Sequence, residues 1–170
     1  MLEASCRGMD VTLDTNVLVH AENIAVSQQA SSLRVLEWMR DRKGEVKWVM
    51  DDQGKAAPDP ATSVLYSEYM RHLKPQGLGL VLFIEFLKSQ RVSWSQRPGH
   101  ATQRRLCLHV SQNKCDRAVL GAAYGSESKV LVTNDYEDFS VATRKAIKKD
   151  LHVTIVCSDQ AIPDAAAVIR

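Results

Sequence analysis

The sequence has few cysteines, no long apolar run and little net charge, and each shortage excludes a class of protein. Its four cysteines form no Cys-x-x-Cys pair, and no histidine cluster flanks them at zinc-site spacing, so reduced cytoplasmic thiols are expected. The longest apolar stretch, residues 78–87, contains Gly79 and Glu85 and is far shorter than the ~20 residues of a membrane helix. We therefore expect a cytoplasmic protein with no membrane segment.

Charge is nearly balanced over the whole chain but uneven along it. The chain has 22 basic and 20 acidic residues, and the net charge of +2 indicates no class of partner. Residues 88–117, however, contain seven basic residues and only one acidic residue. Such a surplus favours a polyanion through counterion release, although it is equally typical of a solvated surface loop. The nucleic-acid-binding candidates are Arg97, Arg104, Arg105, Lys114 and Arg117.

The order of the predicted helices and strands indicates an α/β fold. With 170 residues, the chain is long enough for one domain with a core, expected at residues 9–158, with an appendage at 1–8 and a tail at 159–170. Strand-like and helix-like segments alternate, which favours a parallel sheet with helical crossovers. Strands are expected at 11–13, 46–50, 129–133 and 153–157, helices at 15–22, 31–42, 62–73, 80–89, 114–124 and 141–149, and a basic loop at 95–105. Ser31 or Ser32 is the expected cap of the second helix.

Two of the expected strands end in acids. Asp14 follows the first strand, and Asp135 follows the strand at 129–133, with Asp138 three residues later. Asp116 begins the helix before that second strand, so these acids can meet at the carboxyl edge of the sheet, where open α/β sheets bind ligands. Carboxylates held close together repel one another unless a cation neutralises them, and oxygen ligands favour Mg²⁺ or Mn²⁺ over zinc. Taken singly, these acids also fit a structural role in turns and helix caps.

Three blocks of the sequence stand out together. They are Leu-Asp-Thr-Asn-Val-Leu-Val at 13–19, Cys-Asp-Arg-Ala-Val-Leu-Gly-Ala-Ala-Tyr at 115–124 and Leu-Val-Thr-Asn-Asp-Tyr-Glu-Asp-Phe at 131–139. In this order, over residues 9–157, they resemble the PIN-domain family. The resemblance implies a PIN-like three-layer sandwich with a central parallel sheet flanked by helices, and a metal-dependent endoribonuclease that uses Mg²⁺ or Mn²⁺. The partners that it implies are single-stranded or structured RNA, single-stranded DNA, an antitoxin protein that inhibits a toxin, and a second copy in a homodimer.

The resemblance also implies roles for individual residues. Matched by motif, the acids that bind metal and act in catalysis are Asp14, Glu68, Asp116 and Asp135, with Asp138 as an accessory metal ligand. The polar residues that orient them are Asn16, Thr133 and Asn134. The stretch between Asp14 and Glu68 is longer than in minimal members of the family, so Asp51 and Asp52 remain alternatives for the second acid.

Two other functions are compatible with parts of this pattern. A phosphotransferase of the dehalogenase type needs a second aspartate two positions after the first, and Asn16 occupies that position. A module that keeps the PIN fold but only binds nucleic acid or protein would share every element predicted above. The sequence therefore favours a nuclease and leaves the binding module as its alternative.

Overall fold

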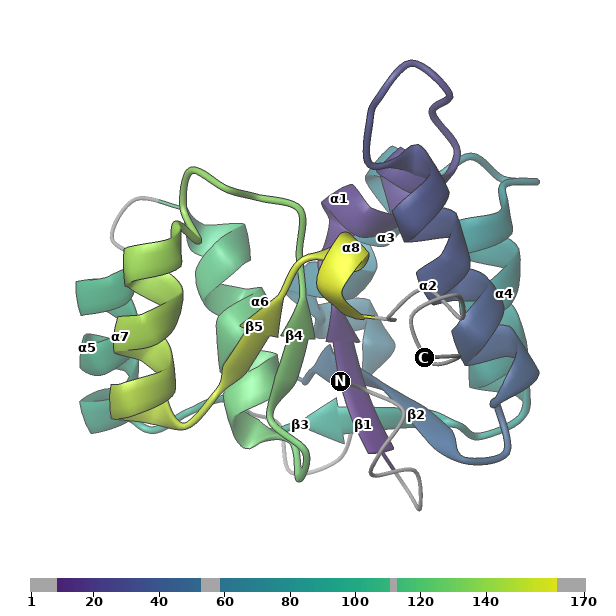
Figure 1. Cartoon of the computed structure of the whole chain (residues 1–170). Helices are drawn as coiled ribbons and strands as arrows, with labels where there is room; N and C mark the ends of the chain where they lie inside the picture. Colours follow the sequence, from purple (N-terminus) through teal and green to yellow (C-terminus); the bar gives the residue numbers. More distant parts are fainter. Residues whose placement is uncertain (1–8, 53–58, 111–112, 162–170) are drawn as a thin grey trace.

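Five parallel strands form the centre of the molecule (Figure 1). The structure is a computed structural model that describes residues 9–52, 59–110 and 113–161. The strands are β1 Met9–Leu13, β2 Val46–Asp51, β3 Val92–Ser95, β4 Val130–Val132 and β5 Thr154–Val156, in the order β3-β2-β1-β4-β5. Every residue of β1 is buried, as expected for a strand of a parallel sheet that is covered on both faces.

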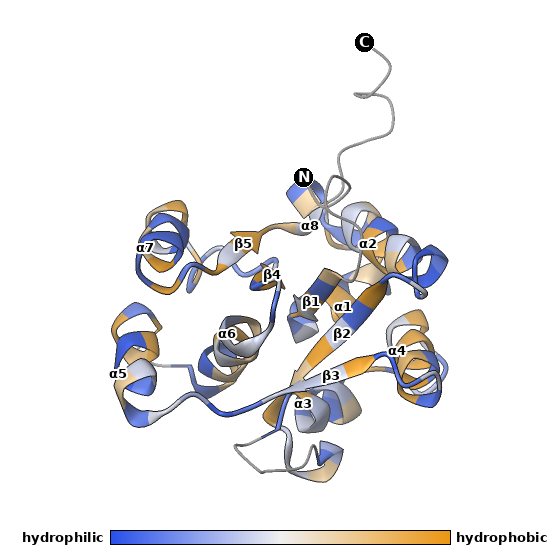
Figure 2. Ribbon diagram, turned by 90° about the horizontal axis from the view of Figure 1, so that it is seen from below, coloured by the Kyte–Doolittle hydropathy of each residue, from blue (hydrophilic) through white to orange (hydrophobic). Residues whose placement is uncertain are grey.

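Helices cover both faces of this sheet. They are α1 Thr15–Ala21, α2 Gln29–Asp41, α3 Val64–His72, α4 Leu78–Lys88, α5 His100–His109, α6 Lys114–Gly125, α7 Val141–Leu151 and α8 Ser158–Ala161, with a short 3₁₀ turn at Pro60–Thr62. Figure 2 shows α5, α6 and α7 on one side of the sheet and α1, α2 and α4 on the other. The expected three-layer α/β arrangement is therefore confirmed.

The strand order has a switch point between β1 and β4. The chain proceeds from β1 to β2 to β3 in one direction, and then adds β4 and β5 on the opposite side of β1. β1 pairs with β4 through Leu13 and Val132, so the residues that follow these two strands come out side by side. Ligands of open α/β sheets bind at such a switch point, and Asp14 and Thr133 are the first residues there.

A cluster of buried aromatic rings fixes α3 against the sheet. Trp48 of β2 packs edge-on against Tyr69, Phe83 and Phe86, with ring centroids 5.3 to 5.9 Å apart. The hydroxyl of Tyr69 donates to the carbonyl oxygen of Leu13 at 2.6 Å, which ties α3 to the last residue of β1. Burial raises the pKa of Tyr69, so this hydroxyl keeps its proton. Helix α3 is thus held beside the strand end that precedes Asp14.

The basic loop expected at 95–105 is a wrong prediction. Residues 92–95 form the edge strand β3, and most of the remainder belongs to α5. Leu106 is the only fully buried residue of α5, so this helix lacks the apolar periodicity that reveals a helix in a sequence. Its contacts with α6 and α7 stabilise a helix that the local pattern does not predict.

The other expected elements are present, with their ends shifted by a few residues. Ser31 and Ser32 do not cap α2, which begins two residues earlier and buries both side chains. The expected appendage at 1–8 lies outside the described residues, and the expected tail begins within α8 and then leaves them. No helix among the described residues has both the length and the apolar character needed to cross a membrane.

Candidate metal centre

Asp14 lies at the end of β1 and is held by two neutral side chains. Its Oδ2 accepts hydrogen bonds from the Thr133 hydroxyl and from the Asn16 amide, each at 2.7 Å. Burial raises the pKa of Asp14; the bond from Thr133 partly offsets this rise, and the nearby charge of Asp135 adds to it. No ion pair between described residues includes Asp14, so its orientation depends on hydrogen bonds alone.

A layer of polar side chains connects the ends of β1 and β4. Asn16 Oδ1 accepts from the backbone N–H of Asn134 at 2.9 Å, and Thr133 Oγ1 accepts from the N–H of Asp135 at 3.0 Å. The amide of Asn134 donates to Ser32 Oγ at 2.9 Å, and its oxygen accepts from the N–H of Ser158 at 3.2 Å. All three predicted supporting residues therefore lie in one network around Asp14. Ser32 and Ser158 are additions that no sequence motif indicated.

Three further carboxylates form what we call the acidic triad: Asp116, Asp135 and Asp138. One oxygen of each lies within 4.8 Å of the others. Asp116 is only 5% exposed, and its Oδ2 has no hydrogen-bond partner among the described residues. Burial, then a side-chain hydrogen bond with Asp138 and the charges of Asp14 and Asp135, raise the pKa of Asp116 to about 8. The triad thus brings three carboxylates together, and no ion pair between described residues includes any of them.

Local hydrogen bonds bring the triad together from two parts of the chain. Asn113 caps α6 by accepting from the N–H groups of Cys115 at 2.9 Å and Asp116 at 3.4 Å, which places Asp116 in the first helical turn. After β4, Asp135 Oδ1 accepts from the N–H groups of Glu137 at 2.9 Å and Asp138 at 3.0 Å. This tight turn folds Asp138 back towards Asp135.

Glu68 lies near the triad but outside it. Its side chain, 18% exposed, contacts His72 at 3.2 Å and Arg71 at 3.6 Å on its own helix. The Cys115 thiol is close enough that Glu68 contributes, after burial, to raising the pKa of that thiol. Glu68 therefore lies beside Cys115, the residue before Asp116, and contacts two basic side chains of its own helix.

Asp51 and Asp52, the alternatives to Glu68, have structural contacts. The carboxylate of Asp51 accepts from the Ser63 hydroxyl and from the N–H groups of Val64 and Leu65, at 2.8 and 2.9 Å, so it anchors the start of α3. Asp52 accepts from the backbone N–H of Arg97 at 3.2 Å. Neither belongs to the acidic triad, and Glu68 is the better placed of the three candidates.

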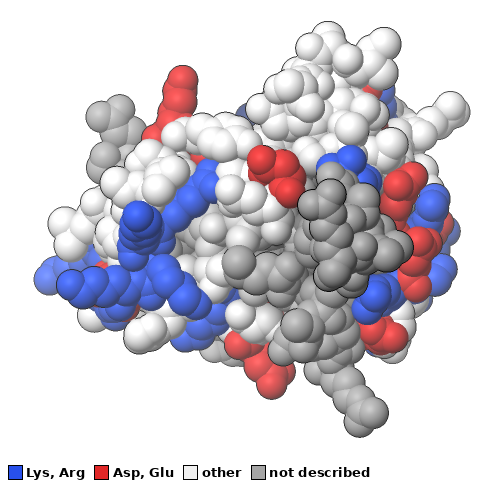
Figure 3. Space-filling view, viewed as in Figure 1, with Lys and Arg blue, Asp and Glu red and all other residues white. Residues whose placement is uncertain are grey.

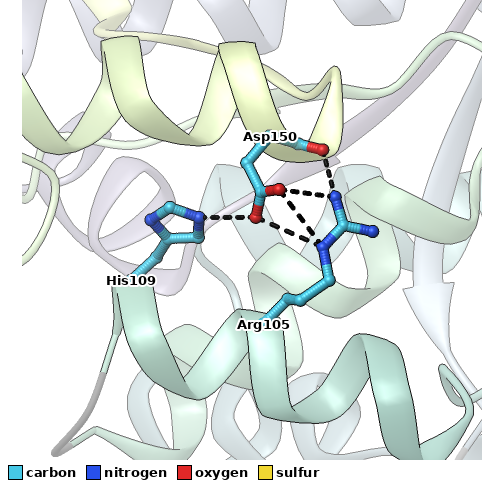
Figure 4. Close-up of polar contacts among 3 residues, drawn as sticks. All are labelled: Arg105, His109 and Asp150. Atoms are coloured by element: carbon cyan, nitrogen blue, oxygen red, sulfur yellow. Dashed lines mark hydrogen bonds and ion pairs between the residues drawn. The ribbon is translucent and has the colours of Figure 1, made fainter.

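The five predicted nucleic-acid-binding residues have different surroundings. Arg97, Lys114 and Arg117 line a groove beside α6, and Arg104 is exposed on α5. Arg105 instead contacts Asp150 of α7, with Nη2 at 2.7 Å from Oδ1 (Figure 4). Figure 3 shows further basic side chains over α7, where Lys145, Lys148 and Lys149 are exposed. The sequence reasoning missed that surface because it followed the charge surplus at 88–117.

Comparisons with family models, with curated proteins and with solved structures give no match for this chain.

Proposed function

We propose that this protein is a metal-dependent nuclease that hydrolyses phosphodiester bonds in RNA, with a PIN-like fold and chemistry. The observation that carries the proposal is the acidic triad, in which a buried oxygen of Asp116 has no hydrogen-bond partner among the described residues. A buried, unpaired carboxylate oxygen is costly unless another group satisfies it. A bound cation satisfies this requirement directly.

The donor set fits a hard divalent cation. Every candidate ligand is a carboxylate oxygen, the type preferred by Mg²⁺ and Mn²⁺. Asp116, Asp135 and Asp138 would hold the ion. When bound, such an ion lowers the pKa of a water molecule and stabilises negative charge on phosphate oxygens.

The chain's own residues supply position and attraction. Thr133 and Asn16 fix the carboxylate of Asp14 next to the triad, and the tie between Tyr69 and Leu13 keeps the Glu68 helix against the same edge. Lys114 and Arg117 flank Asp116 in α6, so the acids have cations nearby that can attract a phosphate backbone. The preference for RNA over DNA comes from the sequence resemblance to PIN-domain ribonucleases.

A cleavage assay with matched aspartate variants tests the proposal. End-labelled single-stranded RNA and DNA are incubated with Mn²⁺, Mg²⁺ or chelator. We expect cleavage of RNA only with metal, and a loss of at least about 100-fold in Asp116→Asn and in Asp14→Asn. Asp41→Asn, which changes a 75% exposed aspartate of α2, is the control and should cleave like the unmodified protein.

Two outcomes would contradict the nuclease. Cleavage that survives chelation or Asp116→Asn would mean that the triad does not act through a metal. An absence of cleavage with either ion, while RNA still binds, would favour the non-catalytic module that binds nucleic acid or protein.

A further inference from the structure

A groove with a volume of about 330 Å³ runs along the flank of α6, and we call it the α6 groove. Its walls come from α6, from α5 and from the ends of β2 and β3. Its volume is in the range of small-molecule sites, which begins at about 300 Å³. The groove is separate from the acidic triad, although α6 contributes residues to both.

The lining of the α6 groove has the chemistry of a nucleotide site. Three cationic side chains, Arg97, Lys114 and Arg117, suit a phosphate. Two side-chain amides, Gln96 and Gln103, suit the polar edge of a base. The apolar part of the lining, which can pack against the flat face of a base, includes Val64, Pro98, Leu106, Ala118, Gly121 and Ala122. Asp51 is the acid in this lining, and both of its oxygens already bind the start of α3.

One polar group at the groove has no hydrogen-bond partner within the described part of the chain. Ser95, at the end of β3, is 6% exposed and lines the groove, and its hydroxyl belongs to the few buried groups without a partner there. Buried hydroxyls are nearly always hydrogen-bonded in native proteins. The Ser95 hydroxyl lies against Gly125 of α6, where an added side-chain carbon would come within 2.1 Å of it, so recognition of a ligand in the groove depends on the other lining residues.

The position of the α6 groove relates it to the acidic triad. Lys114 and Arg117 line the groove, whereas Asp116 lies between them in the first turn of the same helix and belongs to the triad. Successive helix residues project about 100° apart around the axis, so a single turn of α6 presents basic side chains to the groove and a carboxylate to the triad. A strand that crosses this turn of α6 would meet both sites.

We propose that the α6 groove binds one unpaired nucleotide of the RNA strand next to the phosphodiester that the triad cleaves. This inference rests on the proposed nuclease function and adds a nucleotide-binding subsite to it. A base can enter the groove only if it is free of a duplex, since a paired base is stacked and hydrogen-bonded within the helix. The preferred substrate is therefore single-stranded RNA or an unpaired loop.

Binding without cleavage tests the groove independently of the nuclease. The four ribonucleoside 5′-monophosphates are titrated in chelator, with ribose 5-phosphate and inorganic phosphate as separate arms. Binding is followed by NMR and by the protection of Cys107, an exposed thiol in the groove lining, from alkylation. We expect at least one nucleotide to bind more tightly than either phosphate alone, and to bind equally to Asp116→Asn.

Two substitutions place the ligand in the α6 groove. Ala118→Leu fills it and should weaken nucleotide binding by at least about tenfold, because steric exclusion removes the apolar contact surface. Ala146→Leu, at an exposed position of α7, is its matched control. Arg97→Gln changes an exposed side chain and should not affect folding. It is expected to weaken nucleotide binding more at low salt than at high salt. Lys145→Gln, at an exposed position of α7, is its control.

Each result supports or overturns either the groove proposal or the nuclease proposal. Nucleotide binding that Ala118→Leu and Arg97→Gln leave unchanged, an absence of nucleotide binding, or equal binding of inorganic phosphate would overturn the groove proposal. If nucleotides bind as expected but RNA is not cleaved with Mn²⁺, the nuclease proposal fails and the groove remains. In a cleaving protein, Ala118→Leu should raise KM for single-stranded RNA with little change in kcat.

Discussion

Two carboxylate sites in this molecule, Asp150 and the acidic triad, have opposite environments. On α7, Asp150 accepts hydrogen bonds from Arg105 and, at 2.9 Å, from His109 Nε2, and these partners lower the pKa of Asp150 to about 2 (Figure 4). At the sheet edge, Asp116 has acids as its neighbours, and its pKa is raised to about 8. Two basic side chains of α5 contact Asp150, whereas no ion pair between described residues includes an acid of the triad. An acid cluster without such ion pairs is the one expected to take a cation from solution.

The comparison also separates a structural role from a functional one. The contact of Asp150 with Arg105 and His109 joins α7 to α5 on the outer face of the protein. Such exposed ion pairs contribute little to stability, so this group serves mainly to position two helices. An unpaired charge on Asp116 lowers the free energy of unfolding. A buried acidic site that the protein keeps despite this cost points to a bound ligand.

The largest effect expected is a pH dependence of stability that metal removes. Folding raises the pKa of Asp116 from 3.8 to about 8. Between these two pH values the folded chain keeps a proton on Asp116 that the unfolded chain has lost. In chelator, the free energy of unfolding should therefore fall as the pH rises through this window. After allowance for solvent screening, we expect a loss of about 2 kcal/mol between about pH 5 and pH 8. Urea unfolding at several pH values measures it.

Two additions sharpen this test. Asp116→Asn should remove most of the pH dependence and be more stable than the unmodified protein at about pH 8. Mn²⁺ at about 100 times its dissociation constant should add about 2.7 kcal/mol to the unmodified protein and much less to the variant. If Asp116→Asn is less stable than the unmodified protein at high pH, or gains as much stability from Mn²⁺, the acidic triad and Asp150 do not have opposite environments.

A smaller effect is expected at the neutral hydrogen bonds that tie α3 to the strands β1 and β2. Tyr69→Phe removes the donor to Leu13 and the acceptor for Trp48 Nε1, so it should lower the free energy of unfolding by about 1 kcal/mol. No charge is involved, so the loss should be the same at low and high salt. Tyr66→Phe on the same helix is the matched control, and a salt-dependent loss would contradict this account.

The smallest effect is expected at Asp150. Because its pKa is lowered in the folded state, the ion pair stabilises the protein above pH 3.8, and this contribution is lost as the pH falls through about 2. Asp150→Asn should lower Tm by a few degrees at most, less at high salt, and leave the response to Mn²⁺ unchanged. A melting series with Asp41→Asn as the control measures this, and an altered Mn²⁺ response would mean that the two carboxylate groups are coupled.

Local sequence was sufficient for those features that depend on neighbouring residues. The short apolar runs before Asp14 and Asp135 predicted β1 and β4, and the rule for parallel strands placed both acids at one edge. Glu68 was placed beside the apolar stripe of α3, where it lies. Helix α5 was missed because its sequence has almost no apolar face, and its contacts with α6 and α7 cannot be read from its own residues.

The sequence by itself determined the α/β class, the parallel direction of the strands and the edge where Asp14, Thr133 and Asp135 gather, since strand periodicity and the alternation of strands with helices are local properties. Only the tertiary structure decided which charges are paired. Arg105 lies 45 positions before Asp150, and Asp116 comes close to Asp138 only through the packing of α6 on the sheet. Burial and charge depend on distances in space, so the same residue type became a completed ion pair at one site and an uncompensated carboxylate at the other.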